Sequence, residues 1–246
     1  MLTVRGMPSF RLAVSLVVVG VWMGCSPSAQ QSRDRARKFQ ATEHYNEGTL
    51  LGERGELGPA IEAFNQAIKL DPEFAAAYFN RGNARFELGD YEKAIADYDK
   101  AISLDPSDAN MFGNRGTALF LQGKHHEAVD DFDTAIVLDP QNSRVYYERG
   151  NAFAAEGRHE RAIADYSDAI RFDAAFENAY LNRGNSWAAL GDYQKAIDDY
   201  ADFIELNPGV AHAYVNRAIA YDALGDQVQS AADLEKAKDL GFVPPK

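Results

Sequence analysis

The chain of 246 residues carries 37 Asp and Glu against 25 Lys and Arg, which gives it a formal net charge of −12. This acidity argues against nucleic acid as the main partner, because phosphate binding needs a basic surface. The composition, 46% hydrophobic and 25% charged, is that of a folded protein rather than a disordered one, and a single Cys excludes an internal disulfide.

The N-terminal residues have the order of basic, apolar and small residues that is typical of a secretory signal peptide. Arg5 and Arg11 precede an apolar run over residues 12–23, and Gly24 follows it. The run is about 12 residues long, too short to cross a ~30 Å hydrocarbon core as a helix. We therefore expect residues 1–24 to be a signal peptide and the mature chain to be exported.

Residues 21–25, Val-Trp-Met-Gly-Cys, resemble the lipobox of bacterial lipoproteins, in which the Cys receives diacylglycerol and becomes the new N-terminus. The resemblance implies a lipid anchor on Cys25. By resemblance to lipoproteins of Gram-negative bacteria, Ser26 after it, rather than Asp, favours the outer membrane, facing the periplasm, and the choice between inner and outer membrane stays open. Trp22 departs from the family, which usually has Leu there. The alternative is a chance cysteine in a simple signal peptide or an uncleaved anchor.

Residues 25–40 are rich in Ser, Gln and charge and have little to bury, which predicts a tether between the anchor and the folded part. If coiled, its roughly 15 residues would span ~20–25 Å on average. The other interpretation is a solvated, helical lead-in. Its basic side chains either adhere weakly to anionic head groups or are simply solvated. These basic residues are Arg33, Arg35, Arg37 and Lys38.

From residue 41 onward the sequence repeats every 34 residues in several independent columns. Within each unit, apolar residues at helical spacing on both sides of a glycine predict a pair of helices. The glycine column is Gly55, Gly89, Gly123, Gly157, Gly191 and Gly225. The alanine column is Ala60, Ala94, Ala128, Ala162 and Ala196, and the aromatic column is Phe64, Tyr98, Phe132, Tyr166 and Tyr200.

The repeated unit resembles the tetratricopeptide repeat, whose consensus is followed closely by Tyr78-Phe79-Asn80-Arg81-Gly82-Asn83 and by Leu88-Gly89-Asp90-Tyr91-Glu92-Lys93-Ala94-Ile95. The resemblance covers residues 41–244 and implies an all-α fold, a right-handed superhelical solenoid of six helix-turn-helix units. One helix pair cannot bury its apolar stripe alone, so neighbouring units are expected to share the core. The predicted units are 41–74, 75–108, 109–142, 143–176, 177–210 and 211–244.

An arginine recurs at the seventh position of five units, on the side of the first helix that we expect to be packed. A charge that points there requires a counter-charge. An aspartate stands 16 residues later in each of these units, and the first unit lacks both, with Glu47 and Ala63 instead. We expect structural ion pairs, rather than a site for an anionic ligand, between Arg81 and Asp97, Arg115 and Asp131, Arg149 and Asp165, Arg183 and Asp199, and Arg217 and Asp233.

At ~100° per residue, the opposite side of the first helices forms an arc that we expect to be the concave, peptide-binding face. Asn recurs there at the sixth and ninth positions, and a row of amides can hold the backbone of an extended peptide whatever its side chains. Aromatic residues at the fifth position would add apolar anchors. The predicted groove residues are Tyr45, Phe79, Asn80, Asn83, Asn114, Arg144, Tyr147, Asn151, Leu181, Asn182, Asn185 and Asn216.

The asparagines at the sixth position have a second interpretation, hydrogen bonding to neighbouring repeats, which the sequence leaves open. The ninth position lies nearer the middle of the arc and is the better candidate for guest binding. Arg144 is the only cationic side chain on the arc, which disfavours a clamp of Lys and Arg for a C-terminal carboxylate. An extended segment that is neutral or mildly basic fits the acidic array better.

No catalytic or nucleotide-binding motif is found: the sequence has no G-x-S-x-G, H-E-x-x-H, C-x-x-C or G-x-x-x-x-G-K-[ST] pattern. Two residues of the one local histidine cluster, His125 and His159, occupy a column that holds Tyr91 and Tyr193 in other units. We expect them to be packing residues of the turn rather than metal ligands. We therefore expect no catalysis, no cofactor and no metal.

The two resemblances together imply a non-catalytic scaffold or adaptor of the bacterial cell envelope, held at a membrane by lipid on Cys25. It would bind an extended peptide or a partner protein and so recruit or assemble envelope complexes. The alternative is a permanently assembled structural subunit of a secretion, pilus or cell-wall complex. The identity of the partner and the oligomeric state stay open.

Overall fold

The computed structural model describes residues 28–243, and the signal peptide, the lipobox and Cys25 lie outside this range. Twelve α-helices and no strand make up the described residues, which fall into two compact units that divide between Ala118 and Leu119. No helix among them has the length and apolar character needed to span a membrane. The helices are α1 (Ala29–Glu53), α2 (Leu57–Leu70), α3 (Ala75–Glu87), α4 (Tyr91–Leu104), α5 (Ala109–Leu121), α6 (His125–Leu138), α7 (Ser143–Ala155), α8 (His159–Phe172), α9 (Glu177–Ala189), α10 (Tyr193–Leu206), α11 (Ala211–Ala223) and α12 (Gln227–Asp239).

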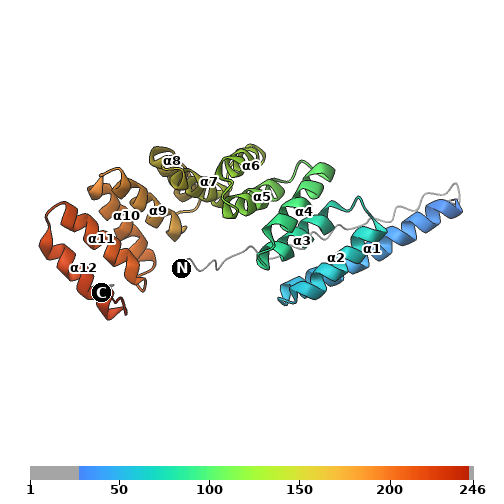
Figure 1. Ribbon diagram of the computed structural model, residues 1–246, viewed down its shortest axis with the longest axis horizontal. Coiled ribbons are helices and arrows are strands. Elements are labelled where there is room, and N and C mark those ends of the chain that lie inside the picture. The colour runs from blue at the N-terminus through green and yellow to red at the C-terminus, as the bar shows by residue number, and fades with distance from the viewer. Residues whose placement is uncertain (1–27, 244–246) are drawn as a thin grey trace. The chain divides into compact units, whose positions relative to one another are not determined.

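Consecutive helices pack as pairs inside each compact unit (Figure 1). In the first compact unit α1 packs on α2, α3 packs on α4, and α2 also contacts α3. In the second unit the pairs are α7 with α8, α9 with α10 and α11 with α12, and the last helix of one pair contacts the first helix of the next. The all-α fold of stacked helix pairs, predicted from the 34-residue period, is confirmed.

A glycine in the left-handed conformation separates the two helices of a pair. Gly89, between α3 and α4, has a φ of 80°, which residues other than Gly rarely adopt. The N–H of Asp90 then donates to the carbonyl of Arg85 at 2.9 Å and closes the turn. The pair ends where Asp105 takes up extended backbone ahead of Pro106, because a proline disfavours helix at the preceding residue.

Small residues let the two helices of a pair approach closely around a buried ring. Tyr98 on α4 is fully buried and faces Gly82 on α3. A Cβ added to Gly82 would lie 2.7 Å from Cε1 of Tyr98, which is inside van der Waals contact. The glycine is therefore needed for the tyrosine ring to fit. The hydroxyl of Tyr98 in turn donates a hydrogen bond to Asn83, a predicted groove residue.

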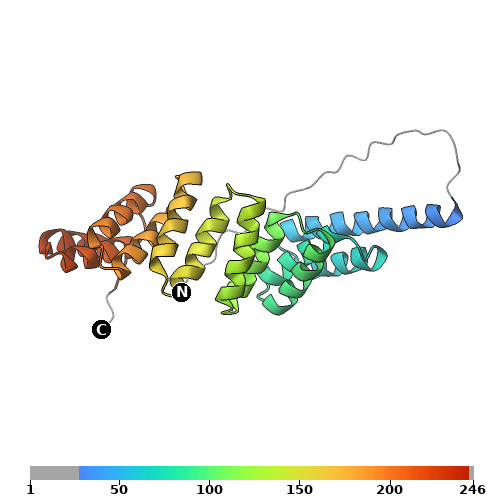
Figure 2. The ribbon, with the colours of Figure 1, turned by 90° about the horizontal axis from the view of Figure 1, so that it is seen from above.

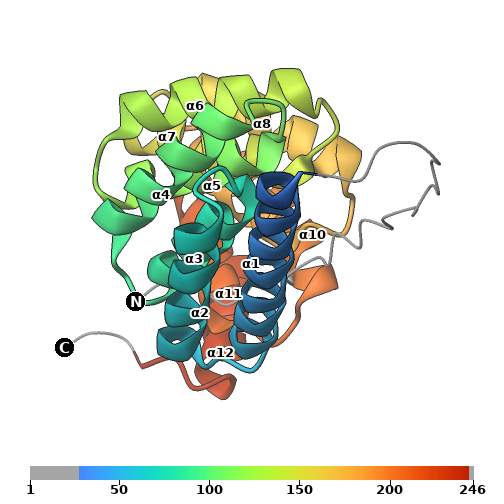
Figure 3. The ribbon, with the colours of Figure 1, turned by 90° about the vertical axis from the view of Figure 1, so that its right-hand side faces the viewer.

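The first helix is longer than the others and includes most of the predicted tether. α1 has 25 residues, whereas its partner α2 has 14, and the two lie side by side (Figure 3). Ser28 and Gln31 form a capping box at its start, and residues 28–40 are exposed where α1 projects beyond α2 (Figure 2). The coiled interpretation of these residues is wrong, because a cap and a run of helix-forming residues stabilise a helix instead.

Candidate functional site

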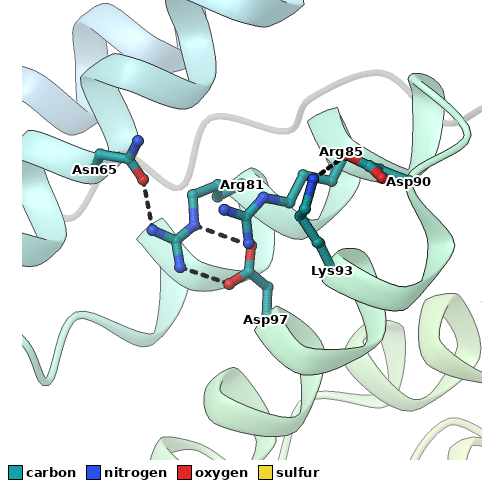
Figure 4. A network of polar contacts seen from close by, with 6 residues as sticks. All are labelled: Asn65, Arg81, Arg85, Asp90, Lys93 and Asp97. Carbon is teal, nitrogen blue, oxygen red and sulfur yellow. Dashed lines mark hydrogen bonds and ion pairs between the residues drawn. The ribbon is translucent and has the colours of Figure 1, made fainter.

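Four of the five predicted ion pairs are bidentate and lie inside their helix pairs. Nε and Nη2 of Arg81 donate to the two carboxylate oxygens of Asp97 at 2.9 and 2.6 Å (Figure 4). The predicted pair of Arg115 with Asp131 falls on different compact units and stays a prediction. The same two-bond geometry, at 2.7–2.9 Å, joins Arg149 to Asp165, Arg183 to Asp199 and Arg217 to Asp233.

Four of these arginines use Nη1 to reach the preceding helix pair as well. In each case the acceptor stands 16 residues before the arginine. The sequence contains this column of acceptors, but we did not predict its role. Arg217 has Ala201 at that place, which offers no acceptor. The contacts are Arg81 with Asn65 at 2.6 Å, Arg115 with Asp99 at 2.5 Å, Arg149 with Asp133 at 2.5 Å and Arg183 with Ser167 at 3.0 Å.

The arginines are engaged by the protein itself. The side chain of Arg183 is 19% exposed and that of Asp199 is 6% exposed, and the guanidinium also lies 5.7 Å from the ring centre of Tyr180. At the end of the array, the hydrogen bond to Asp233 raises the pKa of Arg217, against burial, which lowers it. This geometry supports a structural role, joining helices within and between pairs, rather than an anion-binding role.

Three asparagines of the predicted groove are held by buried tyrosines of the same helix pair. The tyrosine hydroxyl donates to Oδ1 of the asparagine at 2.8–2.9 Å, in the pairs Tyr98 with Asn83, Tyr166 with Asn151 and Tyr200 with Asn185. Burial, and then the charge of Asp199, raises the pKa of Tyr200 to about 12, so the hydroxyl keeps the proton that it donates. The two positions vary together, because the remaining units combine Thr49 with Phe64, Thr117 with Phe132 and Ile219 with Leu234.

Four of the five asparagines at the sixth position bond to the preceding helix pair. Asn80 donates to the hydroxyl of Tyr45 at 3.0 Å. The others donate from Nδ2 to Oδ1 of a ninth-position asparagine at 2.8–3.0 Å, and of the two interpretations left open, bonding to neighbouring repeats describes them. These contacts are Asn114 to Asn83, Asn182 to Asn151 and Asn216 to Asn185.

The ninth-position asparagines keep unused donors. Their Oδ1 accepts two hydrogen bonds, one from a tyrosine and one from the next repeat, which fixes the orientation of the amide. Among residues 28–243, Nδ2 of Asn83 and of Asn185 has no hydrogen-bond partner, whereas Nδ2 of Asn151 reaches Glu148 at 3.4 Å. Asn185 is exposed, and the other two are half-buried. Asn83 and Asn185, each within its own compact unit, therefore offer oriented N–H donors.

The predicted aromatic anchors are partly used by the fold. Burial raises the pKa of Tyr45 and of Tyr147, and the hydroxyl of each accepts a hydrogen bond from an asparagine of the next repeat. Leu181 packs against the core around Tyr200. Ring centroids lie 4.9 Å apart for Tyr45 and Phe74, 4.8 Å for Tyr147 and Phe176, and 5.9 Å for Phe79 and Tyr98.

Glu148 on α7 is a site residue that we did not predict. It lies beside two predicted groove residues, with one carboxylate oxygen 4.0 Å from Nε of Arg144 and the other 3.4 Å from Nδ2 of Asn151. Burial raises the pKa of Glu148, although Arg144 and Asn151 lower it. The signal was present in the sequence, because the other five units carry Asn at this position.

His125 and His159, predicted to be packing residues of the turn, are the first residues of α6 and α8. His125 packs on Phe120 with ring centroids 5.0 Å apart, and its Nδ1, like that of His159, is buried without a hydrogen-bond partner among the described residues. Within residues 28–243 no group of three or more His, Cys, Asp or Glu is arranged to hold a metal ion. The described part of the chain thus offers amide and carboxylate chemistry for recognition.

Comparison with known families decides the nature of the repeat. Family models of the tetratricopeptide repeat match residues 45–109, 114–177 and 177–210, more than half of the chain. The chain belongs to the tetratricopeptide repeat (TPR) family. No curated protein sequence matches it.

Three solved structures resemble this TPR protein over most of their own length. MamA is 26% identical, with a TM-score of 0.62 and a match that covers 65% of this chain and 93% of MamA. YrrB, a TPR protein with an unusual peptide-binding site, is 27% identical, with a TM-score of 0.64 and coverage of 74% and 93%. The pilF protein of Pseudomonas aeruginosa, 21% identical with a TM-score of 0.71 and coverage of 85% and 94%, shows the fold alone. TPR proteins are generally non-catalytic scaffolds for protein interaction.

Proposed function

We propose that this TPR protein is a non-catalytic adaptor that binds an extended segment of a partner protein along the first helices of its repeats. One observation carries the proposal: Oδ1 of Asn83 and of Asn185 is held in place, while Nδ2 has no partner among the described residues. An extended peptide presents backbone carbonyls, which such donors bind whatever the side chains. The peptide-binding site of YrrB supports the same role for this chain.

We further propose that the protein is exported and anchored in the bacterial cell envelope by lipid on Cys25, with the outer membrane as its site. The N-terminal order of basic, apolar and small residues supports export, and the lipobox resemblance supports the anchor. An anchor would keep the binding face at the membrane and raise its effective concentration for a partner there. Cys25→Ser should then move the protein to the soluble fraction and abolish incorporation of labelled fatty acid; unchanged fractionation and labelling would contradict the anchor.

The test of guest binding changes the free donors and keeps the hydrogen bonds that hold them. Asn83→Asp with Asn185→Asp retains an oxygen that accepts from the tyrosines, but replaces the unused N–H donors by a carboxylate oxygen. Gln122→Glu with Gln141→Glu is the matched control, because it adds the same charge at exposed residues next to turns.

The measurement is binding of peptides selected from a random library of acetylated extended peptides against the full chain. The Asp variant should bind them at least ~10-fold more weakly, and the control should bind like the unchanged protein, with circular dichroism the same for all three. If the Asp variant and the control bind the peptides equally well, the asparagines do not contribute to peptide binding. If no peptide can be selected at all, the adaptor function itself is wrong.

A further inference from the structure

Glu148 departs from the repeat at a position where the repeat is otherwise uniform. The sixth position of the first helix is Asn in five units and Glu only in the fourth. Asn80, Asn182 and Asn216 use this position to bond to the preceding helix pair. Glu148 makes no such bond, and among the described residues its polar contacts are with Arg144 and Asn151 of its own helix.

The carboxylate of Glu148 is poorly compensated. Its closest cationic atom, Nε of Arg144, is 4.0 Å away, and its one hydrogen bond, from Nδ2 of Asn151, is long at 3.4 Å. The carboxylate of Asp165, on the partner helix α8, instead accepts two hydrogen bonds from Arg149 at 2.7 and 2.8 Å. Within the same helix pair, the carboxylate of Asp165 is therefore fully paired, whereas that of Glu148 is not.

Holding a charge at this position costs stability. The side chain of Glu148 is only 18% exposed, and burial raises its pKa. The arginine stands four residues before the glutamate, which is the less favourable order for such a pair on a helix. A carboxylate that is withdrawn from water and weakly paired is stabilised further when it forms a direct ion pair with another cation.

The surroundings favour a basic side chain of a guest as that partner. The ring of Tyr147, next to Glu148 on α7, packs on Phe176 with ring centroids 4.8 Å apart and planes inclined by 52°, and supplies apolar surface for an alkyl stem. The net charge of −12 attracts basic segments at long range. We propose that Glu148 is a specificity-determining residue that forms an ion pair with a Lys or Arg side chain of an extended guest. This inference rests on the proposed adaptor function.

A side chain within the segment, rather than an N-terminal amine, is the expected source of the cation. Glu148 lies one helical turn before Asn151 on α7, and Asn185 lies on α9 of the next helix pair. We expect a guest that binds along these helix pairs to extend beyond Glu148 on both sides. A cation there is then carried by a residue in the middle of the segment. Acetylated peptides remove the amine and leave only this source.

The experiment compares Glu148→Asn with the unchanged full chain in selection from the acetylated library. Asn is the residue that the other units carry at this position, so the variant is expected to fold. Glu160→Asn, an exposed change on α8 with the same effect on net charge, is the matched control. Selected peptides should carry Lys or Arg at one fixed position with the unchanged protein and with the control, and not with Glu148→Asn.

A selected peptide then gives the size of the effect. Replacing its basic residue by Gln should weaken binding to the unchanged protein at least ~10-fold and leave binding to Glu148→Asn the same. Peptides that bind well but show no basic position, or a basic position that survives Glu148→Asn, overturn the role of Glu148 while the adaptor function stands. A complete lack of selected peptides overturns both.

Discussion

The hydroxyl of Tyr200 on α10 donates a hydrogen bond to Oδ1 of Asn185 on α9 at 2.9 Å, and so fixes an exposed amide to the buried core of its helix pair. The tyrosine is 2% exposed, whereas the asparagine lies at the surface. Because Oδ1 of Asn185 also accepts from Asn216, the two N–H groups of its amide are the part that is left for a ligand. The core of the repeat thereby orients a group on its binding face.

Tyr200→Phe removes this support and should lower the free energy of unfolding by about 1 kcal/mol, the typical net value of one hydrogen bond. Binding of a selected peptide should weaken as well, because the amide of Asn185 becomes free to rotate. Tyr193→Phe is the control, since its hydroxyl makes no hydrogen bond within residues 28–243. Denaturant unfolding and peptide titration measure the two effects.

Adding Asn185→Thr to Tyr200→Phe recreates the combination that the first and third units carry, Thr49 with Phe64 and Thr117 with Phe132. Thr49 and Thr117 bond to the carbonyl four residues earlier on their own helix, so the double variant should recover stability relative to Tyr200→Phe. It should not recover peptide binding. Recovery of both would mean that the amide is not what the guest contacts.

Arg183→Met should destabilise the protein by about 3–5 kcal/mol, because it leaves the carboxylate of Asp199 buried without its bidentate partner. Arg171→Met, which breaks an exposed pair with Asp168, should cost no more than about 1 kcal/mol. Urea unfolding of both variants gives the comparison. Similar losses for the two would contradict the structural role of the buried arginine.

The ion pairs were accessible to sequence reasoning because both members share one period and are missing together from the first unit. The coupling of Tyr98 with Asn83, and of its equivalents, leaves the same kind of signal in the paired columns, because Tyr and Asn occur together in the same repeats. Helical periodicity assigns each residue to a face of its helix, but it does not say which atom of Asn83 is already engaged. That depends on how successive helix pairs are superposed, which a helical wheel of one unit does not contain.

Two glycines at helical positions should respond to the same substitution with opposite signs. Gly82→Ala places a Cβ 2.7 Å from the ring of Tyr98 and should destabilise by about 1–3 kcal/mol through overpacking. Gly58→Ala on α2 meets nothing within 4 Å and should stabilise by up to about 1 kcal/mol, because Ala is the better helix former. Thermal unfolding separates the two, and a gain at position 82 would contradict the close approach of α3 and α4.

Glu148→Asn should make the protein more stable at neutral pH and not at acid pH. Burial raises the pKa of Glu148 above its ordinary value of 4.5, so the folded state binds this proton more tightly than the unfolded state does. Well below pH 4.5 the carboxyl is protonated in both states and carries no charge penalty. As the pH rises through the raised pKa, the folded protein must hold a buried charge and loses stability, a loss that Asn does not suffer.

Melting temperatures of the unchanged protein and of Glu148→Asn, measured from pH 4 to pH 8, should therefore diverge as the pH rises, with the variant higher. Glu160→Asn controls for the change in net charge at an exposed position. A saturating basic peptide should reduce the difference, since its cation compensates Glu148 only in the unchanged protein. If the difference between the two melting temperatures stays constant from pH 4 to pH 8, the carboxylate is already compensated without a guest. The reason for assigning it a basic partner is then lost.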